Sequence, residues 1–312
     1  MEHIASHHDK YFKEIFSRKE EMSDFITNAL PQIAEFVDFT TLQLDTTQYI
    51  DKNLQIGYSD IAYNCLYKNK IKLKIALLFE HKSQTEDFPH LQLLGYMLKI
   101  WQTNIKQKQH LMPVIPILFY HGSEDWNNKK FEDYFIGIDE TLIKYLPTFD
   151  YELINTKNFS DEQIKQMFQM LSLKTGILIM KHIFDDPDTL INELDSIFEN
   201  LQLLLETENG RNLFETTIIY LFSNLKNDKQ KVTEKLKQIS PKGSDIALTI
   251  AQQFEKKGEL IGIEKTIRKV AINLIRNKVD NHTIKIATNL TDEQIDLIRE
   301  IEQIDNTATN IL

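Results

Sequence analysis

The stretch Leu77–Gln84 reads LLFEHKSQ and places three ionisable side chains directly after an apolar run. In an extended strand, side chains two residues apart point to the same face and lie roughly 7 Å apart. Glu80 and Lys82 would therefore share a face, while His81 would point away. A second carboxylate, Asp60, belongs to the preceding apolar stretch SDIAY. If Asp60 faces the same side, two carboxylates and one ammonium converge at one end of a pair of strands.

This set of groups suits phosphodiester hydrolysis. Two carboxylates can hold a hard divalent cation such as magnesium, which binds one or two carboxylates and keeps several waters. The ion would stabilise charge on a phosphate oxygen and lower the pKa of an attacking water, and Lys82 could orient that water or share the developing charge. We predict Asp60, Glu80 and Lys82 as catalytic residues. The predicted ligands of Mg²⁺, or alternatively Mn²⁺ or Ca²⁺, are Asp60, Glu80 and the backbone carbonyl of His81.

Each part of this set also has an ordinary explanation. A Glu-x-Lys at the end of a strand is usually a salt bridge, and a single aspartate on a strand carries little information. The combination is more informative: an aspartate, a short turn, a strand ending in Glu-x-Lys, and then a helix with Gln92 and Tyr96. Gln92 and Tyr96 lie four residues apart, share a helix face, and could reach a phosphate or the water shell of the metal.

Regular elements must position these residues, and the sequence predicts long ones, since 312 residues contain only 9 glycines and 7 prolines. The apolar pattern predicts a helix over 9–31 and a helix that begins at Pro89. The apolar stripe of this second helix is formed by Leu91, Leu94, Leu98, Trp101 and Ile105. Strands are predicted over 36–50, 54–68, 72–83, 117–122 and 149–156.

Two of these strands carry further expectations. The strand over 72–83 first alternates, with Lys72 and Lys74 between apolar neighbours, and then becomes continuously apolar. This change predicts a strand that passes from an exposed end into a sheet covered on both faces. Pro113 and Pro116 are expected before the strand at 117–122 or at its entry, because proline cannot serve a central ladder.

The second half of the chain is helical by pattern. Ser160 with Gln163, and Thr291 with Gln294, form capping boxes that predict helix starts. Residues 281–298 have the spacing of a helix-turn-helix, which could read DNA. Because the second helix of this segment is acidic, packing or partner binding is the alternative. We predict an α/β domain over 1–205 and an all-helical region over 206–312 that contacts a partner, a second copy or DNA.

The overall composition limits the protein class. With 42% hydrophobic and 26% charged residues, the sequence is typical of a soluble globular protein. The single cysteine, Cys65, excludes an intrachain disulfide and a cysteine-based zinc cluster. No apolar run has the length of a membrane span, so no membrane partner and a cytoplasmic location are expected. The net charge of −10 argues against nonspecific coating of nucleic acid, without excluding local DNA binding.

Several motifs occur in the order seen in the Rpn family: HDKYFKEIF, YSDIAYNC, LLFEHKSQ, LLGYMLKIWQ and VIPILFYHGSEDW. Over roughly residues 5–205 the chain resembles this family of recombination-promoting nucleases, also described as transposase-like, within the PD-(D/E)XK superfamily. The resemblance implies a restriction-endonuclease-like mixed sheet flanked by helices and magnesium-dependent cleavage of DNA. Asp60 and Glu80 would be the metal carboxylates and Lys82 the catalytic lysine. Ser59 stands where the proline that names the superfamily would be.

The resemblance also extends to residues that could bind substrate. Asp9 and Lys13 match the opening motif of the family, and related nucleases use an acidic residue of this helix to assist the metal; exposed helix charges are the ordinary alternative. Gln92 and Tyr96 resemble the Gln-x-x-x-Tyr helix of RecB-like nucleases. His121 ends a strand and could contact phosphate or serve a structural role. These five residues are the candidate substrate-binding residues.

The hypothesis from sequence is a magnesium-dependent DNA endonuclease linked to recombination, mobile elements or defence. Cutting both strands of a duplex usually requires two active sites, so a homodimer is a reasonable assembly, and the helical C-terminal region could bind a protein partner. The alternative is a nuclease-fold module that binds DNA or a partner protein as a regulator, without cutting. The same residues do not exclude RNA as the substrate.

Overall fold

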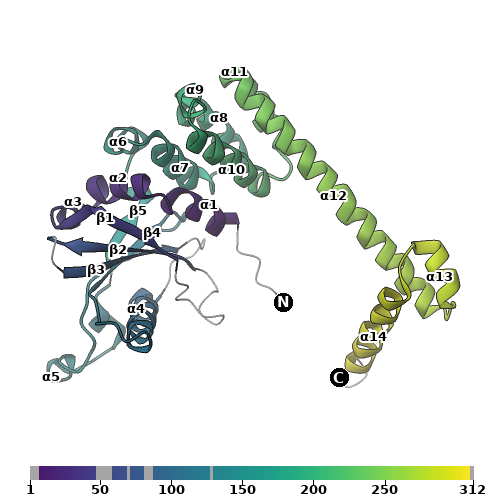
Figure 1. The fold of residues 1–312 in the computed structure, drawn as a ribbon, viewed down its shortest axis with the longest axis horizontal. Coiled ribbons are helices and arrows are strands. Elements are labelled where there is room, and N and C mark those ends of the chain that lie inside the picture. The colour runs from purple at the N-terminus through teal and green to yellow at the C-terminus, as the bar shows by residue number, and fades with distance from the viewer. Residues whose placement is uncertain (1–6, 47–57, 69–70, 81–86, 127–128, 310–312) are drawn as a thin grey trace. The chain divides into compact units, whose positions relative to one another are not determined.

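The computed structural model describes residues 7–46, 58–68, 71–80, 87–126 and 129–309. The chain divides into two compact units, Met1–Ala247 and Leu248–Leu312. The first unit contains a mixed sheet with helices on both sides, and the described part of the second is helical (Figure 1). The predicted fold class, a mixed sheet flanked by helices and followed by a helical region, is confirmed.

The sheet has five strands in the order β1-β2-β3-β4-β5. Their bounds are β1 (Val37–Asp45), β2 (Tyr58–Tyr67), β3 (Ile71–Glu80), β4 (Val114–Tyr120) and β5 (Glu152–Asn155). Strands β1, β2 and β3 pair antiparallel, whereas β3, β4 and β5 run parallel. The carboxyl ends of the three parallel strands therefore meet at one edge of the sheet, beside the amino end of β2.

Strand β4 begins earlier than the sequence predicts and includes Pro116 as its third residue. Pro116 is paired with Ala76 of β3, but the pairing of β4 with β5 begins only at Ile117. At Pro116 the strand has a paired neighbour on one side alone, so a proline there need not remove a ladder hydrogen bond. Pro113 precedes the strand as expected.

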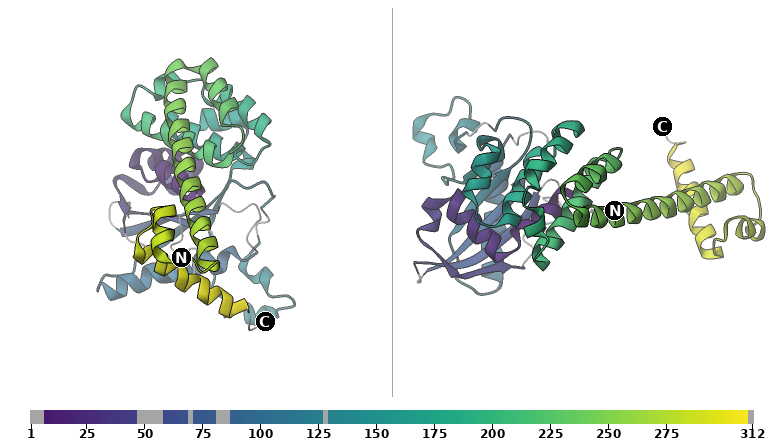
Figure 2. Two further views of the ribbon diagram at one scale, coloured as in Figure 1. Left: turned by 90° about the vertical axis from the view of Figure 1, so that its right-hand side faces the viewer. Right: turned by 90° about the horizontal axis from the view of Figure 1, so that it is seen from above.

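Helices cover both sides of the sheet, with α1 and α2 on one side and α4 on the other (Figures 1 and 2). The helices of the first unit are α1 (His7–Phe16), α2 (Lys19–Ala29), α3 (Pro31–Ala34), α4 (Pro89–Lys106), α5 (Glu140–Ile143), α6 (Asp161–Met167), α7 (Leu171–His182), α8 (Pro187–Ile197), α9 (Leu201–Leu204), α10 (Glu208–Asn224) and α11 (Lys229–Ile239), with short 3-10 turns η1 (Phe131–Tyr134) and η2 (Thr156–Asn158).

The helix predicted over 9–31 is divided into α1 and α2 because Arg18 between them has an extended backbone, with φ −92° and ψ 132°. The break allows aromatic residues from both helices to reach the same strand. The Phe119 ring of β4 lies 5.3 Å from that of Phe16 and 6.0 Å from that of Phe25, between centroids. Both helices thus pack against one shared ring.

The side of the sheet under α1 and α2 is a closed aromatic core. Phe12, Phe16, Phe25 and Phe119 are all 0% exposed. The buried Tyr63 hydroxyl donates to the Phe16 carbonyl at 2.8 Å, which satisfies it locally. Burial raises the pKa of Tyr63 well above its ordinary value, so this phenol stays protonated.

The other side of the sheet is covered by α4. Leu93, Tyr96 and Ile100 pack against Ala62 of β2 and Leu118 of β4. Pro89 occupies the first turn as predicted. The predicted apolar stripe is wrong for Leu91, Leu98 and Ile105, which are 51%, 45% and 64% exposed, whereas its member Trp101 packs against this cluster. The helix is apolar on two faces, and the face that meets the sheet is the one bearing Tyr96.

The first compact unit extends past residue 205, where the sequence placed the end of the α/β domain. Helix α10 packs against α1 and α7, and α11 packs against α8. At the α1–α10 contact the Tyr11 and Tyr220 rings stack with centroids 4.3 Å apart. The Tyr11 hydroxyl also lies 2.9 Å from that of Thr217. Helices α10 and α11 therefore belong to the same compact body as the sheet.

Both predicted capping boxes are confirmed. The Ser160 hydroxyl accepts from the Gln163 backbone N–H at 3.1 Å, and the Gln163 side chain accepts from the Ser160 N–H at 2.7 Å. Thr291 and Gln294 form the same pair of bonds at 3.3 and 2.9 Å. These bonds satisfy N–H groups that helix starts leave without partners.

The second unit is built on α12 (Pro241–Arg276), which enters it from the first unit, with α13 (Asn281–Thr288) and α14 (Asp292–Thr309). Ala271, Ile284 and Ile295 are fully buried together. Asn289, at φ 57°, ends α13 in the left-handed conformation common at helix ends. Residues 281–298 do form two helices joined by a turn, as predicted. The apolar side chains of these helices pack within the second unit. In the described part of the chain, no helix combines the length and apolar character that crossing a membrane requires.

Candidate active site

The register of β2 and β3 places positions 60 and 80 on one face of the sheet. Asp60 is paired with Leu78, and Glu80 with Tyr58. Directly paired residues share a face, as do alternate residues along one strand. Asp60 and Glu80 are therefore diagonal neighbours on a common face, a relation that typically separates two residues by about 7–8 Å.

This common face is the one that α4 covers. Ala62 lies two residues from Asp60 on β2, and Leu118 is paired with Leu78. Both Ala62 and Leu118 contact α4. Positions 60 and 80 also lie where β2 begins and β3 ends, at the edge where the parallel strands terminate. The backbone thus brings the two predicted carboxylates to one face and one edge.

The other two members of the predicted catalytic and metal-binding set, His81 and Lys82, lie outside the described residues. Their roles stay predictions. Within the described ranges, no group of three or more His, Cys, Asp and Glu side chains is arranged to hold a metal ion. The predicted ligands, two carboxylates and a backbone carbonyl, are not a group of that kind.

Gln92 and Tyr96 lie on α4, on the side of the sheet that carries positions 60 and 80. Tyr96 is 4% exposed and packs in the cluster with Ala62 and Leu118. Gln92, one turn earlier, is half-buried. Its Oε1 is buried and has no hydrogen-bond partner among the described residues. A buried amide oxygen without a donor is costly, and it would be stabilised by a bound water or a cation.

Asp9 and Lys13 lie on α1, on the opposite side of the sheet. The His8 ring lies 5.9 Å from that of His121, which directly follows β4. The amino end of α1 is therefore near the edge where β4 ends. Asp9 is half-buried at this end of the helix, whereas Lys13, one turn further along, is exposed.

His121 is positioned as a structural residue. It is 1% exposed, and its Nδ1 lies 2.8 Å from the Met180 carbonyl oxygen. Because a carbonyl can only accept, Nδ1 carries the proton and donates it. The ring also packs 5.1 Å from that of Phe184. These contacts favour the structural alternative over contact with phosphate.

His8 and Tyr220 belong to the same edge, and sequence reasoning gave them no role there. His8 Nδ1 lies 2.6 Å from the Tyr220 hydroxyl, although the two residues are 212 positions apart. Burial raises the pKa of Tyr220 well above its ordinary value, so the phenol remains neutral. No local sequence signal identifies this pair, because a contact over that separation requires the fold.

The motif Tyr120-His121-Gly122 followed by Trp126 has a steric explanation. The Tyr120 ring lies over Gly122, where an added Cβ would fall 2.6 Å from the Tyr120 Cζ. The Trp126 ring also packs against Tyr120, with ring centroids 5.0 Å apart. Only glycine allows this approach. The motif therefore shapes the chain just after β4, at the edge where Glu80 ends β3.

The burial of Lys74 differs from the prediction that the start of β3 is exposed. The alternating start of β3 predicts an exposed end, and Lys72 is indeed exposed. Lys74 is instead 1% exposed and forms an ion pair with Asp45 at the end of β1. A lysine is seldom fully buried unless it is paired. The sequence could not indicate this burial, because the paired carboxylate lies on another strand.

Together, the fold and the site define an α/β protein whose antiparallel hairpin presents two acidic positions on one face, beneath a helix with a glutamine and a tyrosine. The chain belongs to the family described as "Putative transposase, YhgA-like", which matches residues 6–212.

Relatives of known name cover most of the chain. It is 26% identical over 307 residues to the "Inactive recombination-promoting nuclease-like protein RpnE" of Escherichia coli K12, covering 93% of this chain and 97% of that protein. It is 26% identical over 256 residues to the "Recombination-promoting nuclease RpnD" of E. coli O157:H7, covering 79% and 93%. For the "Recombination-promoting nuclease RpnA" of E. coli K12 the identity is 24% over 295 residues, covering 92% and 95%. No solved structure matches the chain.

Proposed function

We propose that this chain is a metal-dependent nuclease of the PD-(D/E)XK type that hydrolyses phosphodiester bonds in DNA and acts in recombination, mobile-element or defence processes. The observation that carries the proposal is the β2–β3 register, which puts Asp60 and Glu80 on one face at one edge of the sheet. The names of two relatives, both recombination-promoting nucleases, support the same activity.

The residues at this edge fit a magnesium ion. Magnesium binds oxygen ligands, commonly one or two carboxylates together with waters. Asp60, Glu80 and the His81 backbone carbonyl would supply such oxygens, and Mn²⁺ or Ca²⁺ could use the same set. The buried Gln92 Oε1, which has no donor among the described residues, is a further oxygen on this side of the sheet. A bound ion would stabilise charge on the phosphate and lower the pKa of a coordinated water.

Side chains of the chain would supply the remaining functions of the site. Lys82, two residues after Glu80, would share the negative charge that develops on the phosphate. The Gln92 amide would hold a water molecule in position. Tyr96, packed against Ala62 and Leu118, would form an apolar surface beside these polar groups. Asp9 would assist from the other side of the sheet.

A plasmid-cleavage assay with magnesium tests the proposal. The wild-type chain should convert supercoiled plasmid to nicked or linear forms, whereas Asp60→Asn and Glu80→Gln should be slower by about 10³-fold. Glu35→Gln is the matched control, because Glu35 is exposed and precedes β1 at the opposite end of the sheet. Equal cleavage by wild type and both site variants would show that the site is elsewhere. A parallel assay with single-stranded RNA distinguishes the two nucleic acids as substrates.

A second candidate function is binding of DNA or a partner without cleavage. It is favoured by one observation, the similarity over 307 residues to a relative named as inactive. Calorimetric titration with MnCl₂ separates the candidates. A nuclease should bind the ion and lose binding in Asp60→Asn, whereas a non-cleaving module would show no ion-binding heat at this site.

We also propose that the helical C-terminal region forms a contact with a second copy, which would provide the two active sites that double-strand cleavage requires. In the second unit, Leu260, Ile263 and Leu297 are 59%, 50% and 56% exposed and line a common apolar groove. Light scattering of the full chain should give twice the monomer mass, and Ile263→Glu should reduce it to that of one chain.

A further inference from the structure

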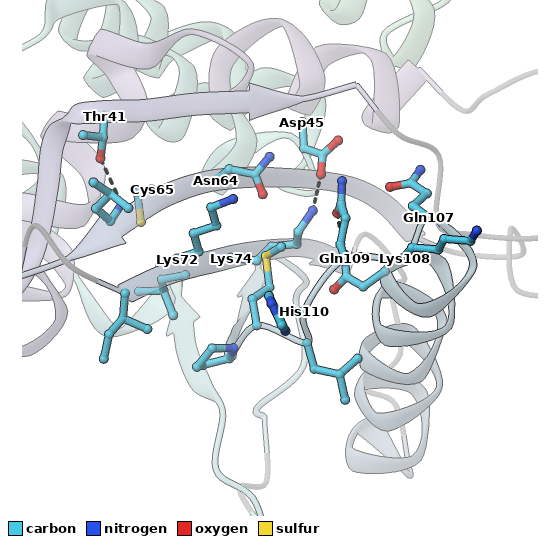
Figure 3. Close-up of a pocket in the computed structure, with 17 residues that line it drawn as sticks. Thr41, Asp45, Asn64, Cys65, Lys72, Lys74, Gln107, Lys108, Gln109 and His110 are labelled. Atoms are coloured by element: carbon cyan, nitrogen blue, oxygen red, sulfur yellow. Dashed lines mark hydrogen bonds and ion pairs between the residues drawn. The ribbon is translucent and has the colours of Figure 1, made fainter.

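A pocket with a volume of about 810 Å³ lies at the end of the β2–β3 hairpin opposite to Asp60 and Glu80 (Figure 3). It is formed by the last residues of β2, the first residues of β3, the end of β1 and the end of α4 with the segment that follows it. None of the predicted catalytic, metal-binding or substrate-binding residues lines it. The pocket is therefore separate from the candidate active site.

Three polar residues, an ion pair and an amide, belong to the lining of this pocket. Lys74 is buried and ion-paired with Asp45, and Asn64 is paired directly with Lys74 across the hairpin. Figure 3 shows the Lys74 and Asp45 side chains pointing toward one another between the strands. Buried ion pairs add little net stability compared with apolar residues of the same volume. Stability alone is thus a weak reason for these charges at this position.

Asn104, on the last turn of α4, supplies a second and independent observation. It lines the pocket and is 2% exposed. Its Nδ2 donates to the Gln109 Oε1 at 3.3 Å, while its buried Oδ1 has no hydrogen-bond partner among the described residues. A buried acceptor that has no hydrogen-bond partner destabilises the folded state. A ligand that brings an N–H donor into the pocket would remove this destabilisation.

The rim of the pocket is basic. Lys72, Lys108 and His110 are exposed there, from the start of β3 and the segment after α4. Within the described part of the chain, Asp45 is the only carboxylate among the lining residues, and Lys74 already pairs with it. The rim therefore favours an anionic group, in a protein whose net charge is −10.

Apolar and thiol groups complete the lining. Leu111, at 58% exposure, and Met112 offer an apolar surface beside the lysines. Burial, with a smaller effect of the Asp38 carboxylate, raises the pKa of the Cys65 thiol to about 11. Cys65 is therefore a neutral thiol near pH 7 and not a thiolate. This excludes a reactive-cysteine role for the pocket and leaves binding.

We propose that this pocket binds a nucleoside 5′-phosphate whose base carries an exocyclic amino group. The phosphate would contact Lys72 and Lys108, the amino group would donate to Asn104, and the base would lie on Leu111 and Met112. Lysine is a common partner of phosphate, and asparagine pairs well with the amino and ring nitrogens of adenine. The volume falls within the range of about 300–1,000 Å³ usual for small-ligand sites.

The same chemical unit could come from a free nucleotide or from a nucleotide within a single strand. Asn64 lies four residues from Asp60 along β2, a separation of about 13 Å in a strand. Because Ala62 between them is packed beneath α4, a strand bound at this pocket would have to pass around α4 to reach the candidate active site. The inference itself does not require cleavage, since binding of a free nucleotide would be sufficient.

Calorimetry on the full chain carrying Asp60→Asn, with a chelator present, tests the pocket independently of any nuclease activity. The probes are adenosine 5′-monophosphate, adenosine, inorganic phosphate and a single-stranded hexamer of deoxyadenylate. Binding of the monophosphate should weaken about tenfold or more in Lys72→Gln, which removes a charged partner of the phosphate, and by a smaller factor in Asn104→Leu, which removes a neutral hydrogen bond. Lys106→Gln is the matched control, because Lys106 ends α4, is exposed and does not line the pocket.

The outcomes are distinct. Tighter binding of the monophosphate than of adenosine or phosphate, lost in Lys72→Gln but kept in Lys106→Gln, supports the proposal with a free nucleotide. Tighter binding of the hexamer with the same pattern of variants supports it with a strand. Absence of binding by every probe, equal binding of phosphate and monophosphate, or equal binding by all variants overturns it. Lys72 is exposed, so its variant should fold even if Asn104→Leu does not.

Discussion

The two sides of the central sheet differ in composition and in what they contribute. Under α1 and α2 the sheet meets a closed aromatic core, in which Phe12, Phe16 and Phe119 are 0% exposed. Under α4 the same strands carry an ion pair between Lys74 and Asp45 and a pocket lined by amides and lysines. Positions 60 and 80 belong to this second side as well.

The difference teaches how one sheet can serve folding and chemistry together. Because side chains alternate along a strand, a single strand can supply apolar residues to one layer and polar residues to the other. The aromatic layer buries four phenylalanine rings, and the buried Glu21 and Asp24 carboxylates of α2 are hydrogen-bonded, so this layer can stabilise the fold. The α4 layer can then hold groups whose value lies in binding and chemistry. The predictions below test this division, from the largest expected effect to the smallest.

Removal of divalent ions should have the largest effect and should act on the α4 side alone. We expect a chelator to reduce plasmid cleavage by at least about 10³-fold, since a metal contributes several kcal/mol of transition-state stabilisation. The urea midpoint of unfolding should change little, because the aromatic layer is independent of the ion. Cleavage that persists in the chelator would contradict the metal-dependent proposal.

Phe119→Ala should destabilise the aromatic core on the α1 and α2 side of the sheet. The ring is fully buried and contacts those of Phe12, Phe16 and Phe25. Deleting it should lower the free energy of unfolding by about 3–5 kcal/mol, as for other buried phenylalanines. Urea denaturation followed by circular dichroism measures this change. Phe135→Ala is a control, since Phe135 is 41% exposed. A similar loss in both variants would argue against the special role of this layer.

Asp45→Asn tests how the buried ion pair on the α4 side of the sheet contributes to stability. It removes the carboxylate that pairs with the buried Lys74 ammonium. Removing one partner of a buried ion pair should cost about 3 kcal/mol of unfolding free energy. The double variant Asp45→Asn with Lys74→Met should recover much of this loss, because no buried charge then remains. If the double variant is no more stable than the single one, the charges contribute to stability in another way.

Asp24→Ala should have a smaller effect, on the helices behind the aromatic side. The Asp24 carboxylate, from α2, accepts from the backbone N–H groups of Gln169 and Met170 at 2.8 and 2.6 Å. It therefore caps the start of α7, whose own cap residue, Met170, has no capping side chain. Loss of this cap should cost about 1–2 kcal/mol in a thermal or urea unfolding experiment. Asp24→Asn, which keeps one acceptor oxygen, should cost less.

The smallest predicted effect concerns pH. Burial alone would raise the pKa of Asp161, but hydrogen bonds from Lys181 and His182 outweigh it and hold the pKa below its usual value. A lowered folded-state pKa gives stability that is present above about pH 4 and is lost as the pH falls through the folded-state pKa. Asp161→Asn should therefore flatten the acid limb of the stability–pH curve by less than about 1 kcal/mol. An unchanged acid limb would contradict this assignment.

The strands could be predicted from the sequence because their local residue patterns are strong. Alternation and continuous apolar runs indicate β2 and β3, and the short separation between Tyr67 and Ile71 fixes their pairing. The length of this turn also decides whether Asp60 and Glu80 lie on the same face of the sheet. With three residues between that pair, Asp60 is paired with Leu78 and shares a face with Glu80. A turn one residue shorter or longer would put the two carboxylates on opposite faces.

Other features required tertiary information. Helix α4 has two apolar faces, and its sequence does not specify that Leu93 and Ile100 rather than Leu91 and Leu98 meet the sheet. The burial of Lys74 depends on Asp45, which is 29 residues away on another strand. The contact of His8 with Tyr220 spans almost the whole of the first unit. Each depends on which elements become neighbours, and local spacing does not encode that.

Helix α4 carries Gln92 near its start and Asn104 near its end, twelve positions or about 18 Å apart along its axis. A single helix thus reaches both ends of the hairpin that it covers. A slide of that helix along its axis would displace both ends together. If binding at one end shifts the helix in this way, it changes the affinity at the other end, and the reverse effect has the same size because coupling between two binding sites is reciprocal.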